Sequence, residues 1–127
     1  MPNKRLVRSR IAAFTAQRGL CHYCLLPIWL DDEQAFCAKY NLTPGELRLR
    51  RCTAEHLRAR QDGGSDSPSN VVAACLKCNQ GRHARKVPLD PDPFRRYVQS
   101  RLLKGGWHPA WVVRALRAES GLATLRC

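Results

Sequence analysis

The apolar residues near the start of the chain recur at helical spacing. Val7, Ile11 and Phe14 lie three or four residues apart, which is the pattern of one face of an α-helix. A helix is therefore predicted over residues 4–18, and Gly19 suits the left-handed conformation in which helices often end. Basic residues occupy the rest of its surface, either as phosphate contacts or as a solvated face: Lys4, Arg5, Arg8, Arg10 and Arg18.

Two short elements are predicted between residues 31 and 46. The segment DDEQAFCAKY, residues 31–40, predicts a helix that is capped by Asp31 and ended by Asn41. Within it, Cys37 is interpreted as a small apolar packing residue. Thr-Pro-Gly-Glu at residues 43–46 predicts a turn, with a capping box that opens another helical turn as the alternative.

Over residues 47–50 the apolar residues recur at every second position. In LRLR, residues 47–50, leucine and arginine alternate, which favours a strand that runs into His56. A Gly-, Ser- and Asp-rich stretch predicts a loop over residues 61–69. An apolar run at residues 71–74 follows, and a helix is predicted from Asn79 towards the proline at 88.

The last part of the chain predicts two helices. Residues 87–94 (VPLDPDPF) are interpreted as a linker, and Asp92 with the following proline caps a helix that ends at a glycine pair, residues 105–106. A final helix is predicted over residues 109–121. Two tryptophans are expected to anchor this tail to the core: Trp107 and Trp111.

The length and charge of the chain indicate its domain size and its kind of partner. At 127 residues the chain is long enough for one small domain with helical extensions. Its formal net charge is +12 and its sequence pI about 10.1, mostly from arginine, which matches phosphate geometry. This favours a nucleic-acid partner over an ordinary basic surface. No apolar run approaches the roughly 18 residues of a membrane span, and no secretory signal is recognised, so we expect a cytoplasmic protein with no membrane partner.

The seven cysteines do not fit a secreted disulfide framework. Their number is odd, and four of them form two Cys-x-x-Cys pairs, Cys21 with Cys24 and Cys75 with Cys78. These pairs predict one shared, closed, structural zinc site, with disulfides or free thiols as the alternatives. A redox role would need a thioredoxin-like βαβ pattern, which the sequence lacks. His22, inside the first pair, is interpreted as a surface side chain rather than as a ligand.

An acid–histidine pair stands between the two cysteine pairs. Glu55 and His56 are adjacent, and successive side chains of a strand point to opposite faces, so one of the two can hold a metal while its neighbour faces an attacking water. A histidine titrates near neutral pH and can take a proton from water. Alone, the pair would more often be a structural histidine beside a carboxylate.

The order of these motifs resembles the HNH endonuclease family. From Cys21 to Lys86 the chain carries CxxC, EH, GGSDSPSN and VVAACLKCN in that order. The resemblance implies an α+β fold with a small ββα-metal core, braced by the zinc knuckles and flanked by N-terminal and C-terminal helices. It implies three segments: a basic helix over 1–19, a nuclease core over 20–88 and a helical extension over 89–127.

The resemblance also implies roles for single residues. His56 would be the general base, and Asn70 would tie the loop so that His56 is aimed correctly. Glu55 and Asn79 would bind a catalytic divalent cation, Mg²⁺, Mn²⁺ or another, and His83 is an additional ligand, a phosphate contact or an exposed helix residue. Glutamate at 55 and asparagine at 79 depart from the Asp and His that are frequent in the family.

The implied activity is hydrolysis of DNA to a 5′-phosphate and a 3′-hydroxyl. The alternative is a zinc-dependent nucleic-acid-binding protein that does not cleave. The expected assembly is a monomer or homodimer, alone or in a larger phage or restriction complex. Five basic residues near the site are expected to contact phosphates: Arg58, Arg60, Arg82, Arg85 and Lys86.

Overall fold

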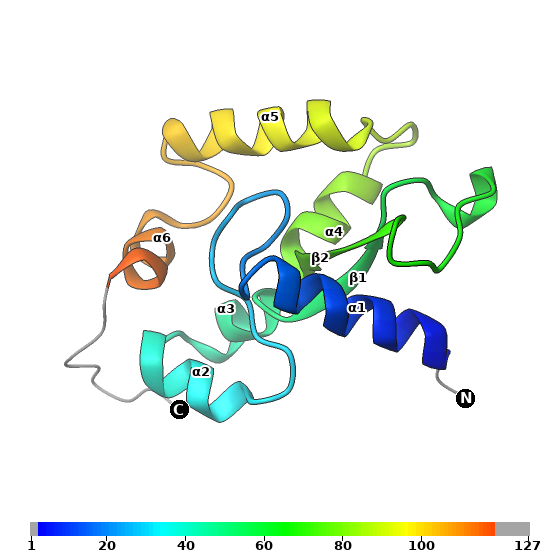
Figure 1. Cartoon of the computed structure of the whole chain (residues 1–127). Helices are drawn as coiled ribbons and strands as arrows, with labels where there is room; N and C mark the ends of the chain where they lie inside the picture. The colour runs from blue at the N-terminus through cyan, green and yellow to red at the C-terminus, as the bar shows by residue number, and fades with distance from the viewer. Residues whose placement is uncertain (1–2, 119–127) are drawn as a thin grey trace.

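The computed structural model describes residues 3–118. Its elements in chain order are α1 (Lys4–Ala16), α2 (Glu33–Tyr40), α3 (Pro44–Leu49), β1 (Cys52–His56), the 3₁₀ turn η1 (Arg60–Asp62), β2 (Val71–Cys75), α4 (Leu76–His83), α5 (Pro91–Leu103) and α6 (Ala110–Arg117). Figure 1 shows α1 crossing the β1–β2 hairpin, with α4 rising from the end of β2 and α5 running beyond α4. This mixed architecture confirms the predicted α+β class.

The two strands form an antiparallel sheet. Cys52 lies opposite Cys75, and His56 lies opposite Val71. Because α4 starts at the residue after β2, the order strand, strand, helix expected from the family resemblance is present. The hairpin thus carries the acid–histidine pair on β1 and delivers the second cysteine pair at the junction of β2 and α4.

Helix α1 agrees closely with its prediction. Oδ1 of Asn3 accepts hydrogen bonds from the backbone N–H groups of Arg5 and Leu6 at 3.1 and 3.2 Å, which caps the first turn. Beyond the helix, Gly19 has a φ of +73°, a left-handed conformation that glycine adopts without strain. The helix ends two residues earlier than predicted.

Two helix caps were predicted at the wrong acidic residue. Asp32, not Asp31, caps α2: its Oδ1 accepts from Ala35 N at 2.9 Å. Asp90, not Asp92, stands at the N-cap of α5, because a proline follows it directly and occupies the first helical turn. Where several acidic residues stand together, composition alone does not say which one is the cap.

The strand predicted from residue 47 into His56 is confirmed only over Cys52–His56, which form β1, and its first part is wrong. Residues Pro44–Leu49 form α3, so the alternative of another helical turn was right, although Thr43 makes no side-chain capping bond. Four alternating residues fit a helix as well as a strand, and Pro44 has the backbone angle of a first helical turn. As a result Arg50 points inward and is fully buried, with its guanidinium against His108.

Helix α4 begins and ends earlier in the chain than predicted. It begins at Leu76 rather than at residue 79, because Sγ of Cys75 accepts a hydrogen bond from Cys78 N at 3.3 Å and caps it. It ends at His83, well before Val87. The earlier start carries the second cysteine pair into the first helical turn.

The C-terminal helices pack against α4 through Trp107. A Cβ placed on Gly81 of α4 would lie 2.5 Å from the Trp107 ring, so the helix and the indole are in direct contact there. The Trp107 and Phe94 ring centroids are 5.8 Å apart. Trp107 and Trp111 both pack on the core, as predicted. Helix α6 ends at Arg117, and the predicted end at residue 121 lies outside the described residues.

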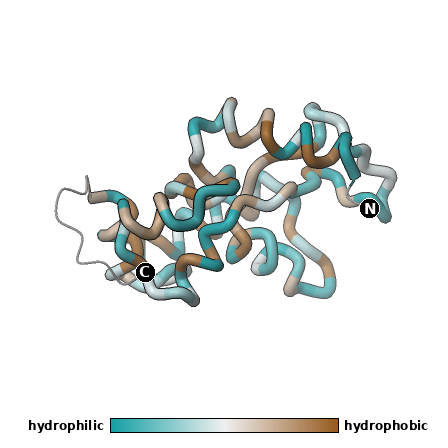
Figure 2. The backbone as a smooth tube through the Cα atoms, turned by 90° about the horizontal axis from the view of Figure 1, so that it is seen from below, coloured by the Kyte–Doolittle hydropathy of each residue, from teal (hydrophilic) through white to brown (hydrophobic). Residues whose placement is uncertain are grey.

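The core gathers around the cysteine pairs. Its buried members include Tyr23, Leu42, Val98 and Val112, all inaccessible to solvent, and Cys37 is buried among them. Figure 2 shows hydrophobic and hydrophilic stretches alternating along the backbone. Within the described part of the chain, no helix is long and apolar enough to cross a membrane.

Candidate functional site

The two cysteine pairs meet in space. The four Sγ atoms of Cys21, Cys24, Cys75 and Cys78 lie within 4.8 Å of one another, and all four residues are buried. Four sulfurs that bind one zinc at about 2.3 Å lie about 3.8 Å apart, so the cluster has the size of a tetrahedral site. The cluster can therefore hold a metal ion such as zinc, and with four sulfur ligands such a site is closed.

Hydrogen bonds to these sulfurs support the thiolate form that binds metal. Cys75 N donates to Sγ of Cys21 at 3.3 Å, and the indole Nε1 of Trp107 donates to Sγ of Cys78 at 3.3 Å. Burial alone would raise the pKa of Cys21, but its contacts with the other three thiols bring that pKa well below its ordinary value. The cluster therefore already favours one thiolate.

Two neighbours of the cluster are not part of it. Cys52 is buried, and burial raises the pKa of its thiol to about 12, so it stays protonated. His22 is half-buried, and its Nδ1 lies 3.0 Å from a guanidinium nitrogen of Arg95. Arg95 also donates to the His22 carbonyl at 2.8 Å, which ties α5 to the first cysteine turn.

The acid–histidine pair opens into a hollow of about 510 Å³. Glu55 and His56 of β1 line it together with Asn79 and His83 of α4. Leu6 of α1 is on its rim, so the N-terminal helix reaches the same site. The structure thus brings the sequence-predicted residues of two elements to one hollow.

Glu55 is buried between two basic side chains. Its Oε1 lies 3.1 Å from Nε2 of His83, and its Oε2 lies 3.3 Å from Nη1 of Arg82. The carboxylate is only 2 % exposed, and burying a charge is costly unless it is paired. Both partners come from α4, one turn beyond Asn79.

Arg82 does not have the place that the sequence predicted. It is buried, and it donates to the backbone carbonyls of His56, Leu57 and Leu89 at 3.0 to 3.2 Å as well as to Glu55. Its guanidinium is therefore engaged with protein acceptors and is not offered to a phosphate. The sequence pattern, a basic residue near a catalytic motif, does not distinguish these two uses.

Asn79 is held by its amide nitrogen. Nδ2 donates to Oγ1 of Thr53 at 2.9 Å, and Thr53 in turn donates to the carbonyl of Ala74 at 2.7 Å. The Asn79 side chain thus joins α4 to β1 directly and to β2 through Thr53. Because Asn79 follows Cys78, the cysteine cluster determines where this side chain stands.

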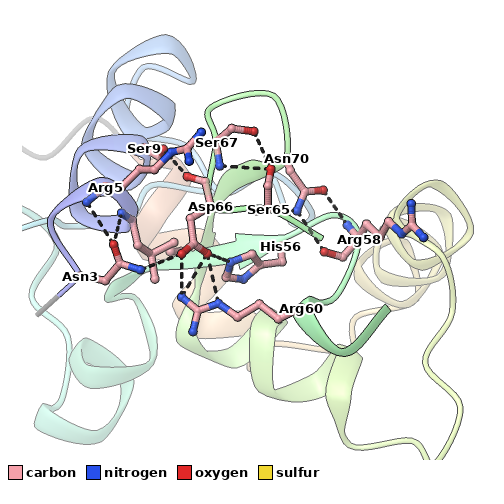
Figure 3. A network of polar contacts seen from close by, with 12 residues as sticks. Asn3, Arg5, Ser9, His56, Arg58, Arg60, Ser65, Asp66, Ser67 and Asn70 are labelled. Carbon is pink, nitrogen blue, oxygen red and sulfur yellow. Dashed lines mark hydrogen bonds and ion pairs between the residues drawn. The ribbon is translucent and has the colours of Figure 1, made fainter. Parts of the chain in front are cut away.

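Asn70 ties the two ends of the loop between the strands (Figure 3). Its Oδ1 accepts from Arg58 N at 2.9 Å, and its Nδ2 donates to the carbonyls of Arg58 and Ser65 at 3.0 and 2.8 Å. These bonds hold the chain directly after β1. Asn70 is therefore placed to determine the direction in which the end of β1 points.

Asp66 was not predicted from the sequence as a site residue. Its Oδ1 lies 2.7 Å from Nε2 of His56, and Figure 3 shows its carboxylate at the centre of a polar network. The hydrogen bond from His56, with further bonds from Asn3 and Arg60, holds the pKa of Asp66 below its usual value. The only sequence signal was a carboxylate in a loop, which does not show that the loop folds back on the histidine.

The remaining predicted phosphate contacts are exposed. Arg58 and Lys86 line a second hollow of about 460 Å³, which shares Ala59, Gln61 and His83 with the first. Arg60 is half exposed and also bonds to Asp66, and Arg85 lies over the Tyr97 ring at 5.0 Å. Their contact with nucleic acid stays a prediction.

A family comparison agrees with this geometry. The model described as HNH endonuclease matches residues 37–85, which include β1, the loop, β2 and α4. This match confirms the resemblance: the segment carries an HNH domain, a type of domain that is generally a nuclease. No curated protein and no solved structure matches the chain.

Proposed function

We propose that this chain is a metal-dependent endonuclease that hydrolyses phosphodiester bonds of DNA. The observation that carries the proposal is the shared hollow in which His56 stands beside Glu55, Asn79 and His83. These are a candidate base and a set of oxygen and nitrogen ligands within one small volume. The match of this segment to the HNH endonuclease family supports the same activity.

The donor set fits a divalent cation. Two ligands at right angles around an ion, each about 2.1 Å from it, lie about 3 Å apart, and Oε1 of Glu55 lies 3.1 Å from Nε2 of His83. The side-chain oxygen of Asn79 would be a third ligand. Because Mg²⁺ prefers oxygen ligands whereas imidazole suits transition metals, we expect Mn²⁺ or another transition metal to support the site better than Mg²⁺. A bound cation supplies positive charge that stabilises the phosphate and the leaving 3′ oxygen.

The protein's own residues divide the remaining work. His56 takes a proton from water, which then attacks phosphorus. Asn70 holds the loop that follows His56, through its bonds to Arg58 and Ser65. Arg82 binds one oxygen of Glu55 and leaves the other directed towards His83. The products are a 5′-phosphate and a 3′-hydroxyl.

The substrate class follows from charge. The net charge of +12 attracts a polyanion, and exposed cations line both hollows or their rims. We assign phosphate contacts to four of the predicted residues: Arg58, Arg60, Arg85 and Lys86. These contacts provide affinity without reading bases, so weak sequence preference is expected.

Plasmid nicking tests the proposal. Wild type, His56→Ala and Glu55→Gln are compared with Mn²⁺, with Mg²⁺ and with chelator, and Glu33→Gln on α2 is the matched carboxylate control. We expect cleavage in Mn²⁺ to fall at least about 100-fold in His56→Ala while DNA binding persists. Undiminished cleavage by His56→Ala would show that another group is the base. DNA binding with no cleavage in any divalent ion would favour the alternative, a zinc-dependent binding protein.

A further inference from the structure

The contact between Asp66 and His56 indicates that the two nitrogens of the His56 ring have different roles. We propose that Asp66 is the positioning residue of His56: its carboxylate holds the imidazole through Nε2, so that Nδ1 is the atom that accepts the proton from water. The inference rests on the proposed nuclease function and specifies how its base is prepared. The distance that supports it is 2.7 Å between Oδ1 of Asp66 and Nε2 of His56.

The proton of the neutral imidazole is assigned by its partner. An ionised carboxylate only accepts hydrogen bonds, so the ring nitrogen that faces it must carry the hydrogen. Asp66 stays ionised because donors surround it, namely His56, Asn3 and Arg60. In the neutral ring one nitrogen carries hydrogen and the other a lone pair, which therefore lies on Nδ1.

The carboxylate itself is held from several directions. Nδ2 of Asn3 donates to Oδ2 of Asp66 at 2.7 Å. Arg60 donates through Nε to Oδ1 at 3.1 Å and through Nη2 to Oδ2 at 3.2 Å, a two-point contact that restricts rotation of the carboxylate. A group with this many partners has one orientation, and so has the ring that it binds.

Helix α1 holds the backbone of the same residue. Oγ of Ser9, which is 2 % exposed, donates to the Asp66 carbonyl at 2.7 Å. Asn3 bonds to the carboxylate with its nitrogen and caps α1 with its oxygen, so a single side chain links the helix start to Asp66 (Figure 3). Through this clamp the N-terminal helix contributes to the position of His56.

In the proposed hydrolysis step, Nδ1 of His56 is the base. A proton passes from water to Nδ1 while the water oxygen forms a bond to phosphorus. The bond between phosphorus and the 3′ oxygen breaks, its electron pair leaves with that oxygen, and solvent supplies the proton that completes the 3′-hydroxyl. Asp66 exchanges no proton in this step, and it stabilises the imidazolium that forms.

The tautomer of His56 tests the proposal directly. The full chain, loaded with zinc and ¹⁵N-labelled, is studied by long-range ¹H–¹⁵N correlation of the histidine rings, with His56 assigned by the signals lost in His56→Gln. We expect the Nε2–H tautomer in wild type at a pH where the ring is neutral. An Nδ1–H tautomer would overturn the proposal. This measurement needs no cleavage, so it decides the role of Asp66 even if no divalent ion supports nuclease activity.

Variants of Asp66 separate positioning from general support of the fold. Asp66→Ala is expected to populate both tautomers and to lower kcat about 10- to 100-fold with little change in KM, and Asp66→Glu to recover part of the loss. Asp62→Ala, at an exposed aspartate of the same loop, is the control and should match wild type. A folded Asp66→Ala protein with the wild-type tautomer overturns the positioning role, whether or not its cleavage is impaired.

Discussion

Nε1 of Trp107 donates a hydrogen bond to Sγ of Cys78 at 3.3 Å. Through this bond the segment between α5 and α6 reaches the cysteine cluster. Lys77, the neighbour of Cys78, lies over the same indole at 4.9 Å. The C-terminal helices are therefore attached to the residues that would hold zinc, so the structural metal and the helical extension support each other.

Loss of one cluster cysteine should abolish the fold. Cys75→Ser is expected to lose zinc and to unfold or aggregate, because metal binding and folding are coupled in sites of this kind. The measurements are zinc content per chain, expected to be one in wild type, and circular dichroism with and without chelator. Cys52→Ala is the matched control, because this buried thiol lies outside the cluster. The Cys52→Ala protein should keep one zinc per chain. A folded, active Cys75→Ser protein would contradict a zinc site shared by the four cysteines.

A methyl group at position 81 should disrupt the contact of α4 with Trp107. In Gly81→Ala the new Cβ would lie 2.5 Å from the indole, so the ring or the helix must move, at a cost of about 1–3 kcal/mol in unfolding free energy. Gly45→Ala, also in a helix, has no atom within 4 Å of the new Cβ and should be neutral or slightly stabilising. Urea unfolding compares the two, and equal stabilities would contradict the packing described.

Arg82 should matter for stability rather than for binding DNA. Arg82→Leu leaves Glu55 without the buried guanidinium at 3.3 Å, and breaking a buried pair in this way costs about 3 kcal/mol or more. Arg96→Leu, at an exposed arginine of α5, should change stability by about 0.5 kcal/mol or less. Thermal unfolding at one zinc concentration measures both. If Arg82→Leu is as stable as wild type but binds DNA more weakly, Arg82 contacts phosphate, as the sequence predicted.

His108 should make the fold sensitive to acid. Burial, with Arg50 beside it, lowers the pKa of His108 from 6.5 to about 3 in the folded protein. The unfolded chain therefore binds a proton that the folded chain excludes, so stability is full above pH 6.5 and falls as the pH drops below it. The loss approaches about 1.4 kcal/mol per pH unit, or about 2 kcal/mol at pH 5.

The measurement for His108 is urea unfolding between pH 5 and pH 8 with zinc held constant. His108→Gln cannot take up the proton, so its stability should depend less on pH than that of wild type. The difference between the two proteins isolates His108 from the cysteines, which both proteins share. Parallel pH profiles would show that His108 is accessible to protons in the folded state.

Exposed cations should tune DNA affinity through salt. Arg58→Ala and Lys86→Ala each remove one predicted phosphate contact beside the second hollow. Each should weaken binding about equally for all sequences and reduce the slope of log K against log salt by about one. Lys39→Ala, on α2, is the control. Fluorescence anisotropy with a labelled duplex gives these slopes, and an effect on some sequences only would indicate base contact.

Part of the fold was predictable because local signals were sufficient. The apolar spacing of α1 and the glycine after it predicted that helix to within two residues of its end. The same kind of reasoning failed at residues 47–50, where a short alternation met a proline-led helix. Short segments take their conformation from packing, and the inward turn of Arg50 onto His108 depends on a contact between residues 58 apart.

By itself, the sequence determined which chemistry the chain carries. Two Cys-x-x-Cys pairs, the Glu55-His56 pair and Asn70 can be recognised by residue type and order, because ligands and bases are limited to a few side chains. Only the tertiary structure decided how those groups are used. In the folded protein, Arg82 and His83 both contact the Glu55 carboxylate. Asp66 contacts His56, and the Asp66 backbone is held by Ser9 of α1. Such contacts join residues from distant segments, and they exist only after the hairpin, the loop and both helices have packed together.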